Sequence, residues 1–173
     1  CQIEDEDSML KIAEEIAIQT MHFDEVYFKS SFDKANRSSA SSKRGPGMEE
    51  GLRILEDVKN ESQLPVLTDV HECHQVKPVA EVVDVIQIPA FLSRQTDLIK
   101  TAWQSGKIVN VKKGQFMAPL DVENIIHKCQ DYAGQSNHDR VWITERGVTH
   151  GYNSLVVDFA GIQLIKRRIC NPI

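Results

Sequence analysis

The sequence predicts an α/β protein built on a parallel sheet. Short runs rich in β-branched and aromatic residues alternate with longer runs whose apolar residues recur at helical spacing. The strand runs are apolar on both faces, as expected where helices cover both sides of a sheet. No glycine-rich phosphate loop follows the first of these runs, so nothing favours a nucleotide-binding doubly wound fold.

Five runs are expected to form strands, because each is rich in the residue types that favour a pleated, buried surface. In chain order they are VYFKSSF (26–32), PVLTDVH (65–71), VIQIPAF (85–91), KIVNVKK (107–113) and VWITERG (141–147).

Six helices are expected around these strands, because their apolar residues are spaced by three and four positions. The first follows an Asp- and Ser-rich start that supplies caps. In chain order the helices cover 8–22, 47–59, 74–82, 95–104, 120–132 and 152–166. Residue 1 lies just before a helix and the final NPI follows one, so we expect a strand before the first residue and another opening at the end.

The composition is that of an ordinary globular protein. The chain has 173 residues, of which 26% are charged and 41% hydrophobic, and its net charge is −5. This charge disfavours a nucleic-acid-binding protein, and no apolar run has the length of a membrane span. The cysteines stand at positions 1, 73, 129 and 170 without a CxxC pair or a zinc spacing, which predicts reduced thiols and a cytoplasmic protein.

One connection is long and polar. Residues 33–46 read DKANRSSASSKRGP, a stretch that suits a disordered linker by its serine and glycine content. It also carries several cations, and these favour an active-site loop that binds an anion.

Polar residues concentrate at the carboxyl ends of the expected strands. In chain order they are Lys29, Ser31, Asp33, Lys34, Asn36, Arg37, Asp69, His71, Gln87, Arg94, Asn110, Lys112, Lys113, Gln115, Glu145 and Arg146. In a parallel barrel these ends meet at one mouth, where active sites lie. A positive mouth on an acidic protein fits small substrates with several negative charges, such as sugar phosphates.

Several of these residues have two interpretations. Lys29 lies in a buried strand, where a lysine is costly unless it meets an anion. Asp69 and His71 share a strand face, so they form either a buried ion pair or a proton-transfer pair. Lys113 is expected to point away from the mouth because strand neighbours alternate sides, and Glu145 is expected to pair with a barrel cation.

Longer motifs carry a family resemblance over essentially the whole chain. They are FKSSFDKANRSS (28–39), TDVHE (68–72), DVIQIPAFLSRQTDL (84–98), VNVKKGQFMAP (109–119), TERG (144–147) and GYNSLVVDF (151–159). Together they closely resemble the 3-deoxy-D-manno-octulosonate 8-phosphate synthases. KANRSS favours this family over the heptulosonate 7-phosphate synthases, which carry a KPRT-type motif at that place.

The resemblance implies a (β/α)8 TIM barrel that is incomplete here. Residues 1–173 would form a partial domain with about strands two to six and their helices. The implied reaction is a transferase reaction, in which phosphoenolpyruvate condenses with D-arabinose 5-phosphate and water. Its products are 3-deoxy-D-manno-octulosonate 8-phosphate, used in lipopolysaccharide biosynthesis, and phosphate.

The resemblance also implies roles for single residues. The expected phosphoenolpyruvate-binding residues are Lys34, Lys112 and Arg146, with Gln115 and Ala90 nearby. Lys29 and Gln87 are expected to contact substrate from their places on the strands. The expected pentose-phosphate residues are Asn36, Arg37 and Ser38, together with Arg94 across a subunit interface of a homotetramer. The expected catalytic residues are Lys34, Asp69, His71 and Lys112. Lys112 and His71 both remain candidates for the general acid or base.

The family has a metal-dependent form with a cysteine just after the first strand. Cys1, followed by Gln2, Ile3 and Glu4, matches that form and is expected to bind a divalent metal such as Zn, Fe or Mn. The other ligands implied by the family would lie beyond Ile173. A lone cysteine is otherwise seldom a ligand.

Three interpretations of function remain. We expect a fragment of a complete octulosonate phosphate synthase, because the motifs are intact. The alternatives are a heptulosonate phosphate synthase and an inactive remnant that binds sugar phosphate without turnover.

Overall fold

The structure is a computed structural model that describes residues 2–131 and 138–173. The chain divides into two compact units. Unit 1 comprises residues 1–69 and 77–85, and unit 2 comprises residues 70–76 and 86–173.

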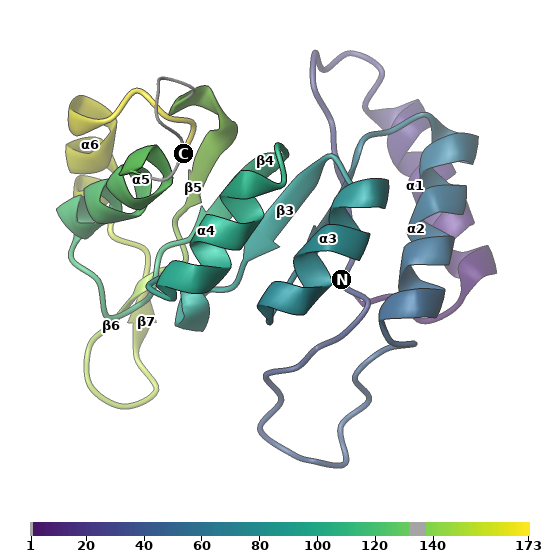
Figure 1. Cartoon of the computed structure of the whole chain (residues 1–173), viewed down its shortest axis with the longest axis horizontal. Helices are drawn as coiled ribbons and strands as arrows, with labels where there is room; N and C mark the ends of the chain where they lie inside the picture. The colour runs from purple at the N-terminus through teal and green to yellow at the C-terminus, as the bar shows by residue number, and fades with distance from the viewer. Residues whose placement is uncertain (1, 132–137) are drawn as a thin grey trace. The chain divides into compact units, whose positions relative to one another are not determined.

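Unit 1 pairs two helices with two parallel strands. Its elements are α1 (Glu6–Gln19), β1 (Phe28–Lys29), α2 (Met48–Ser62) and β2 (Val66–Asp69), and α3 (Cys73–Val82) ends within it. α1 and α2 pack side by side (Figure 1). β1 pairs with β2 in parallel, with Phe28 opposite Val66. The core between these layers contains Ala13, Leu55 and Val58, none of which is exposed.

Unit 2 repeats the strand–helix alternation and ends in a hairpin and a helix. Its elements are β3 (Val85–Ile88, from Ile86 on), η1 (Ala90–Leu92), α4 (Thr96–Gln104), β4 (Ile108–Lys112), η2 (Pro119–Asp121), α5 (Val122–Asp131), η3 (His138–Arg140), β5 (Val141–Thr144), β6 (Val148–Thr149), β7 (Leu155–Val156) and α6 (Phe159–Arg168). β4 and β5 pair in parallel, and α4 and α5 lie side by side (Figure 1). The strand order is the chain order β1-β2-β3-β4-β5, as successive βα units produce.

The expected α/β class and all five expected strands are confirmed, each strand being shorter than its run in the sequence. The last expected helix, 152–166, is wrong over its first half. Residues 155 and 156 instead pair antiparallel with β6. The chain turns between these strands through Gly151 and Asn153, both at positive φ, and α6 begins only after Asp158.

Short segments near both ends of the described chain make backbone contacts with neighbouring segments. In unit 1 the Ile3 amide donates to the Ser31 carbonyl at 3.1 Å, and Gln2 forms a parallel bridge with Ser31. In unit 2 the Ile143 amide donates to the Pro172 carbonyl at 2.9 Å. Segments at both ends thus lie beside strands. Among the described helices, none is long and apolar enough to cross a bilayer.

Candidate functional site

A cluster of two lysines, a serine and an aspartate lies at the carboxyl ends of β1 and β2 in unit 1. Ser31 is fully buried, and its hydroxyl donates to Asp69 Oδ1. The Ser31 hydroxyl oxygen in turn accepts from Lys34 Nζ at 2.7 Å and from Lys29 Nζ at 3.4 Å. Lys29 Nζ also lies 4.0 Å from Asp69 Oδ1. The structure therefore brings together three of the predicted residues around Ser31.

The electrostatics of this cluster favour an anion. Burial lowers the pKa of Lys34 from its ordinary value, and repulsion from Lys29 lowers it further. Asp69 acts in the opposite direction but is a weaker influence than these two. A bound anion would relieve the repulsion between the two cations, which is what a phosphate-binding site requires.

The loop 33–46 is pinned at its base. The Arg44 guanidinium donates to both oxygens of Asp33, at 2.8 Å for Nε, and the Lys34 amide donates to the Arg44 carbonyl at 2.7 Å. Arg37 reaches Gln2 Oε1 at 3.0 Å, whereas Asn36 and Ser38 are exposed. The loop therefore has a fixed base and presents the residues predicted for the pentose phosphate to solvent.

The base of the loop also requires a glycine. Gly45 has φ +119°, and a Cβ placed on it would lie 2.4 Å from the Phe32 carbonyl oxygen. No side chain fits there, because the backbone of Phe32 closes the space. This close approach holds the loop against the end of β1, where Lys34 meets Ser31.

In unit 2, β4 and β5 place two predicted cations on adjacent strand ends. Lys112 stands opposite Thr144 in the parallel register. The Thr144 hydroxyl donates to Asn110 Oδ1 at 2.7 Å, so these two side chains share one face of the sheet. Lys112 follows Asn110 by two positions on the same strand, which directs its side chain to that same face. Arg146 follows Thr144 by two positions but lies beyond the end of β5. Arg146, just beyond the strand, is exposed.

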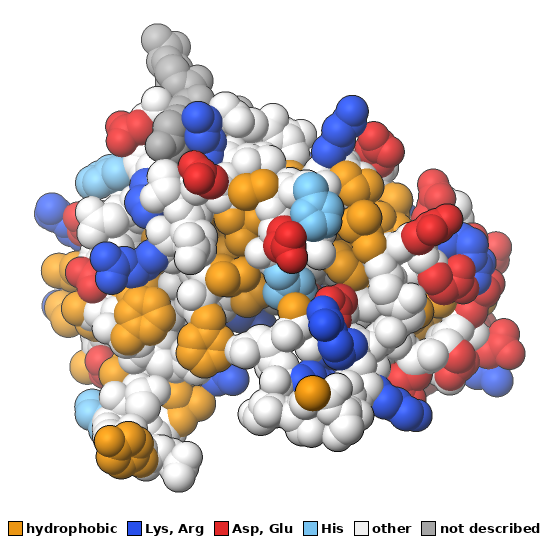
Figure 2. Space-filling model, turned by 60° about the horizontal axis from the view of Figure 1, so that its bottom comes forward, with side chains coloured by type: hydrophobic (Ala, Val, Ile, Leu, Met, Phe, Trp, Pro, Cys, Tyr) orange, Lys and Arg blue, Asp and Glu red, His pale blue; other side chains and the backbone are white. Residues whose placement is uncertain are grey.

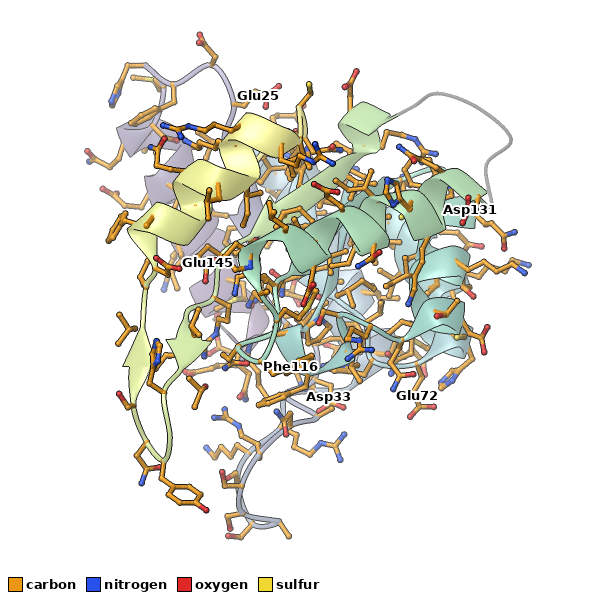
Figure 3. All side chains as sticks on the ribbon, turned by 90° about the vertical axis from the view of Figure 1, so that its left-hand side faces the viewer. Glu25, Asp33, Glu72, Phe116, Asp131 and Glu145 are labelled. Carbon is orange, nitrogen blue, oxygen red and sulfur yellow. The ribbon has the colours of Figure 1, made fainter. Side chains whose placement is uncertain are left out.

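Lys113 and Glu145 form a buried ion pair behind these ends. Their side chains are 1% and 9% exposed, and Lys113 Nζ lies 3.5 Å from Glu145 Oε1. Glu145 Oε1 also accepts from the Gly147 amide at 2.6 Å. Lys113 is therefore directed away from the face of Asn110, and the expected pairing of Glu145 with a cation is confirmed. Figure 3 labels Glu145 among the side chains of the molecule.

The remaining predicted residues of unit 2 differ in burial. Gln87 and Ala90 are buried at the end of β3 and the start of η1, whereas Arg94 is exposed. Lys128 Nζ donates to the Arg94 carbonyl at 2.9 Å. Gln115 Oε1 is buried and has no hydrogen-bond partner within the described part of the chain. Because an amide can turn over, this position offers either a donor or an acceptor to a ligand.

Asp69 and His71 fall in different units, so the structure leaves both of their interpretations open. The backbone amide of His71 donates to Gln75 Oε1 at 2.7 Å, and so does that of Glu72 at 3.2 Å. Gln75 thereby fixes the turn that leads from β2 into α3. His71 is held in place by its backbone at the end of that strand.

Sequence reasoning missed the central role of Ser31. It stood among the polar residues after the first strand but was not chosen as a site residue. Its spacing of two from Lys29 and three from Lys34 was the available signal, since strand geometry puts Lys29 and Ser31 on one face. Only the structure shows that one hydroxyl joins both lysines to Asp69.

The predicted metal ligand Cys1 lies outside the described residues. Over residues 2–131 and 138–173 no three His, Cys, Asp or Glu side chains gather as a metal site. Cys73, Cys129 and Cys170 are free thiols, as the sequence predicted. Burial raises the pKa of the Cys129 thiol to about 12, so it stays protonated and is a poor ligand. The described residues therefore do not by themselves fit a bound metal.

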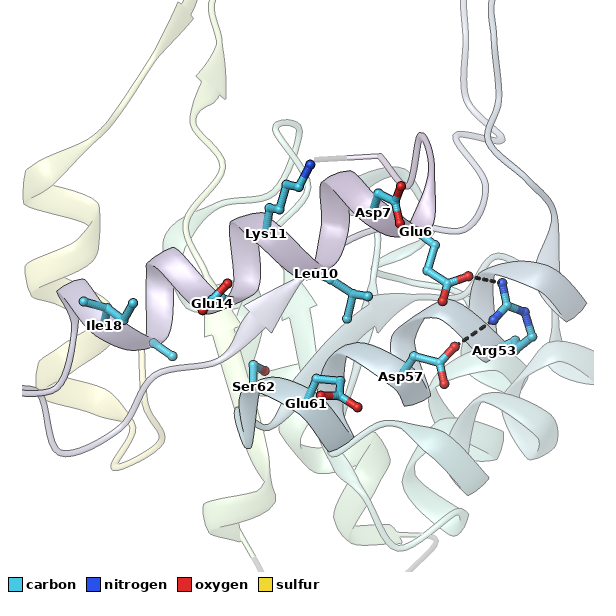
Figure 4. A pocket seen from close by; sticks show the side chains of 11 residues that line it. Glu6, Asp7, Leu10, Lys11, Glu14, Ile18, Arg53, Asp57, Glu61 and Ser62 are labelled. Carbon is cyan, nitrogen blue, oxygen red and sulfur yellow. Dashed lines mark hydrogen bonds and ion pairs between the residues drawn. The ribbon is translucent and has the colours of Figure 1, made fainter.

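A hollow lies on α1 and α2 in unit 1, with a volume of about 940 Å³. Acidic side chains gather on this side of the molecule (Figure 2). Arg53 crosses the hollow and pairs with Glu6 at 2.5 Å and Asp57 at 2.7 Å (Figure 4). The other carboxylates that line the hollow would repel a phosphate. This hollow is therefore not a candidate site for the anionic substrate.

Comparisons with known proteins agree with the motifs. A model of the DAHP synthetase I family matches residues 1–173. Three curated relatives carry the name 2-dehydro-3-deoxyphosphooctonate aldolase. That from Synechococcus sp. is 54% identical over 98% of this chain and 59% of its own length, that from Geobacter sulfurreducens 49% over 96% and 60%, and that from Shewanella woodyi 52% over 95% and 57%. The chain spans about three fifths of the length of these relatives.

Proposed function

The chain belongs to the DAHP synthetase I family, and from that premise we propose that the protein condenses phosphoenolpyruvate with D-arabinose 5-phosphate and water. The products are 3-deoxy-D-manno-octulosonate 8-phosphate and inorganic phosphate. The observation that carries this proposal is the Lys29–Ser31–Lys34–Asp69 cluster, which places two cations beside one buried hydroxyl. The names of the relatives support the choice of product.

The family resemblance supports assigning the binding of phosphoenolpyruvate to Lys34, Lys112 and Arg146. The two contacts of Lys29 and Lys34 with Ser31 support a role for Lys29 as well. Gln115 lies after β4 with a buried amide that has no partner among the described residues, which supports its assignment to the same ligand. Fixed cations lower the cost of bringing two anionic substrates together.

The loop residues Asn36, Arg37 and Ser38 are assigned to bind the pentose phosphate. Their exposure supports this role, because a ligand must reach them from solvent. Arg94 is also exposed and is proposed to reach this phosphate from a neighbouring subunit of a homotetramer. We propose that the protein works in the cytoplasm, in lipopolysaccharide biosynthesis.

The reaction forms a carbon–carbon bond and a new carbon–oxygen bond at C2, and it breaks the carbon–oxygen bond between C2 and the phosphate. C3 of phosphoenolpyruvate attacks the aldehyde carbon, whose oxygen takes up a proton. Water adds its oxygen to C2 and loses one proton, which balances the one taken up by the aldehyde oxygen. Its second proton is lost as the C2 hydroxyl becomes a carbonyl and phosphate leaves with the bridging oxygen. Lys34 suits proton transfer, because its lowered pKa lets it release a proton more readily than an ordinary lysine. Lys112 and His71 remain the other candidates.

We further propose that Cys1 binds a divalent metal when the remaining ligands are supplied. Support comes from its neighbour Gln2, which bridges to Ser31 and so lies beside the lysine cluster. Metal content measured on a longer protein that carries the remaining ligands, with and without the Cys1→Asn change, tests this assignment. An unchanged content would remove Cys1 as a ligand.

Replacing Lys34 tests the proposed binding site most simply. Lys34→Met should weaken phosphoenolpyruvate binding by at least about tenfold, because it removes a cation that faces the anion. Lys43→Met is the matched control, since Lys43 is exposed on the same loop. Calorimetric titration of both variants gives the two affinities.

Equal affinities in the two variants would remove Lys34 from the site. Binding of both substrates without phosphate release would favour the alternative of an inactive sugar-phosphate-binding protein.

A further inference from the structure

The buried pair Lys113–Glu145 takes no part in the proposed chemistry, yet it lies directly behind two residues that do. Lys113 follows Lys112 in the chain, and Glu145 precedes Arg146. Both members of the pair are almost completely buried, at 1% and 9% exposure. Two charges taken out of water are costly, so their presence calls for an explanation.

The pair belongs to a small group of contacts just beyond the paired strands β4 and β5. The Lys113 amide donates to the Thr144 carbonyl at 2.9 Å, which continues the parallel register by one residue. Glu145 Oε1 then accepts from the Gly147 amide at 2.6 Å and faces Lys113 Nζ at 3.5 Å. The ladder is thus extended by a side-chain bridge at the point where both strands become loops.

The same ammonium group also contacts the loop that follows β4. Lys113 Nζ lies 3.4 Å from the Gly114 carbonyl oxygen and 3.5 Å from that of Met117. These two contacts hold both ends of the segment 114–117 near the ammonium group, and Gln115 belongs to this segment. One buried ammonium therefore joins the loop after β4 to the loop after β5.

We infer that Lys113 and Glu145 are positioning residues that fix the directions of Lys112, Gln115 and Arg146 toward the bound anion. Because strand neighbours alternate sides, a pair locked on the helix side forces the adjacent residues onto the other side. A buried ion pair is weak evidence for stability, since apolar replacements often fold as well. Geometry, rather than stability, is its contribution here. This inference rests on the proposed function of those three residues.

The double variant Lys113→Met, Glu145→Gln separates geometry from stability. It removes both charges together, so neither is left buried alone, and glutamine leaves the Gly147 amide only a neutral, weaker acceptor. Its free energy of unfolding should stay close to that of the unaltered chain. Its dissociation constant for phosphoenolpyruvate should rise about tenfold, because a small misplacement of binding groups weakens contacts strongly.

Two further variants complete the design. Glu145→Gln alone leaves Lys113 buried without a counter-charge, and it should lose both stability and affinity. Glu123→Gln is the matched control, because Glu123 pairs with Arg168 at 2.6 Å on the exposed surface of the same unit. This control should bind phosphoenolpyruvate within about twofold of the unaltered chain, as expected for a surface pair.

Amide hydrogen exchange provides a readout that needs no ligand. Exchange at the Met117 and Gly147 amides should accelerate about tenfold in the double variant, while the Val111 and Ile143 amides inside the strands keep their rates. If the double variant binds phosphoenolpyruvate and exchanges these amides like the unaltered chain, the pair has no positioning role. If the unaltered chain binds no phosphoenolpyruvate, the proposed function fails. The exchange rates still decide whether the pair orders both loops.

Discussion

Ser31 shows how much of this site depends on a single small side chain. Its hydroxyl has one proton, which goes to Asp69, and its oxygen still accepts from two lysines. The sequence predicted Lys29, Lys34 and Asp69 as site residues from their positions at strand ends. It did not predict that they share one partner, because a serine in a strand has many possible roles. Contacts across neighbouring strands decide this, and no local pattern encodes them.

The lowered pKa of Lys34 predicts an unusual pH dependence. Phosphoenolpyruvate binding needs the charged lysine, so affinity should fall as the pH passes the lowered pKa, before an ordinary lysine titrates near 10.5. The stability changes with the opposite sign. Between the lowered pKa and 10.5 the unfolded chain binds more protons, so the free energy of unfolding should rise with pH.

Titration of phosphoenolpyruvate from neutral pH to about pH 10 measures the first effect, and urea unfolding over the same range measures the second. The Lys34→Met variant should show neither dependence. An affinity that is flat until an ordinary lysine titrates would contradict the lowered pKa.

At the scale of elements, the sequence predicted the alternation of strands and helices well, because apolar periodicity is a local property. It failed at 152–166, where apolar residues at helical spacing form a short hairpin first. Leu155 and Val156 find strand partners in β6, and a turn with Gly151 and Asn153 at positive φ allows the return. The tertiary pairing overrides the helical pattern there.

Two glycines, one in the loop 33–46 and one just after it, are predicted to differ in how much they contribute to stability. Gly45 and Gly47 both have positive φ, at +119° and +89°, but only Gly45 has the Phe32 carbonyl in the place of a Cβ. Gly47→Ala should cost about 1 to 3 kcal/mol, because its φ of 89° with a ψ of 174° lies in a region that side chains other than glycine avoid. Gly45→Ala should cost clearly more and should also weaken phosphoenolpyruvate binding, because the base of the Lys34 loop must move.

Urea unfolding of the two variants, followed by ligand titration, measures both effects. Equal losses of stability would show that the close approach at Gly45 does not hold the loop.

At the scale of the molecule, family membership and motif content agree, and the chain spans about three fifths of the length of its curated relatives. The parallel strand order and the class of the fold were predictable from composition and periodicity. The positions of the cations were predictable too, because they stand at the carboxyl ends of strands. One group lies at the ends of β1 and β2 in unit 1, and the other lies at the ends of β4 and β5 in unit 2. The sequence predicted that Lys113 points away from the mouth and that Glu145 pairs with a cation. It did not predict that the two residues pair with each other, because their contact depends on how neighbouring strands align.

The central claim is that these cations serve phosphoenolpyruvate and a five-carbon aldose phosphate. The most direct test is phosphate release from phosphoenolpyruvate by this chain, offered D-arabinose 5-phosphate or a four-carbon aldose phosphate in turn. We predict release with the five-carbon aldose alone. Release with the four-carbon aldose, or equal release with no aldose, would contradict the claim.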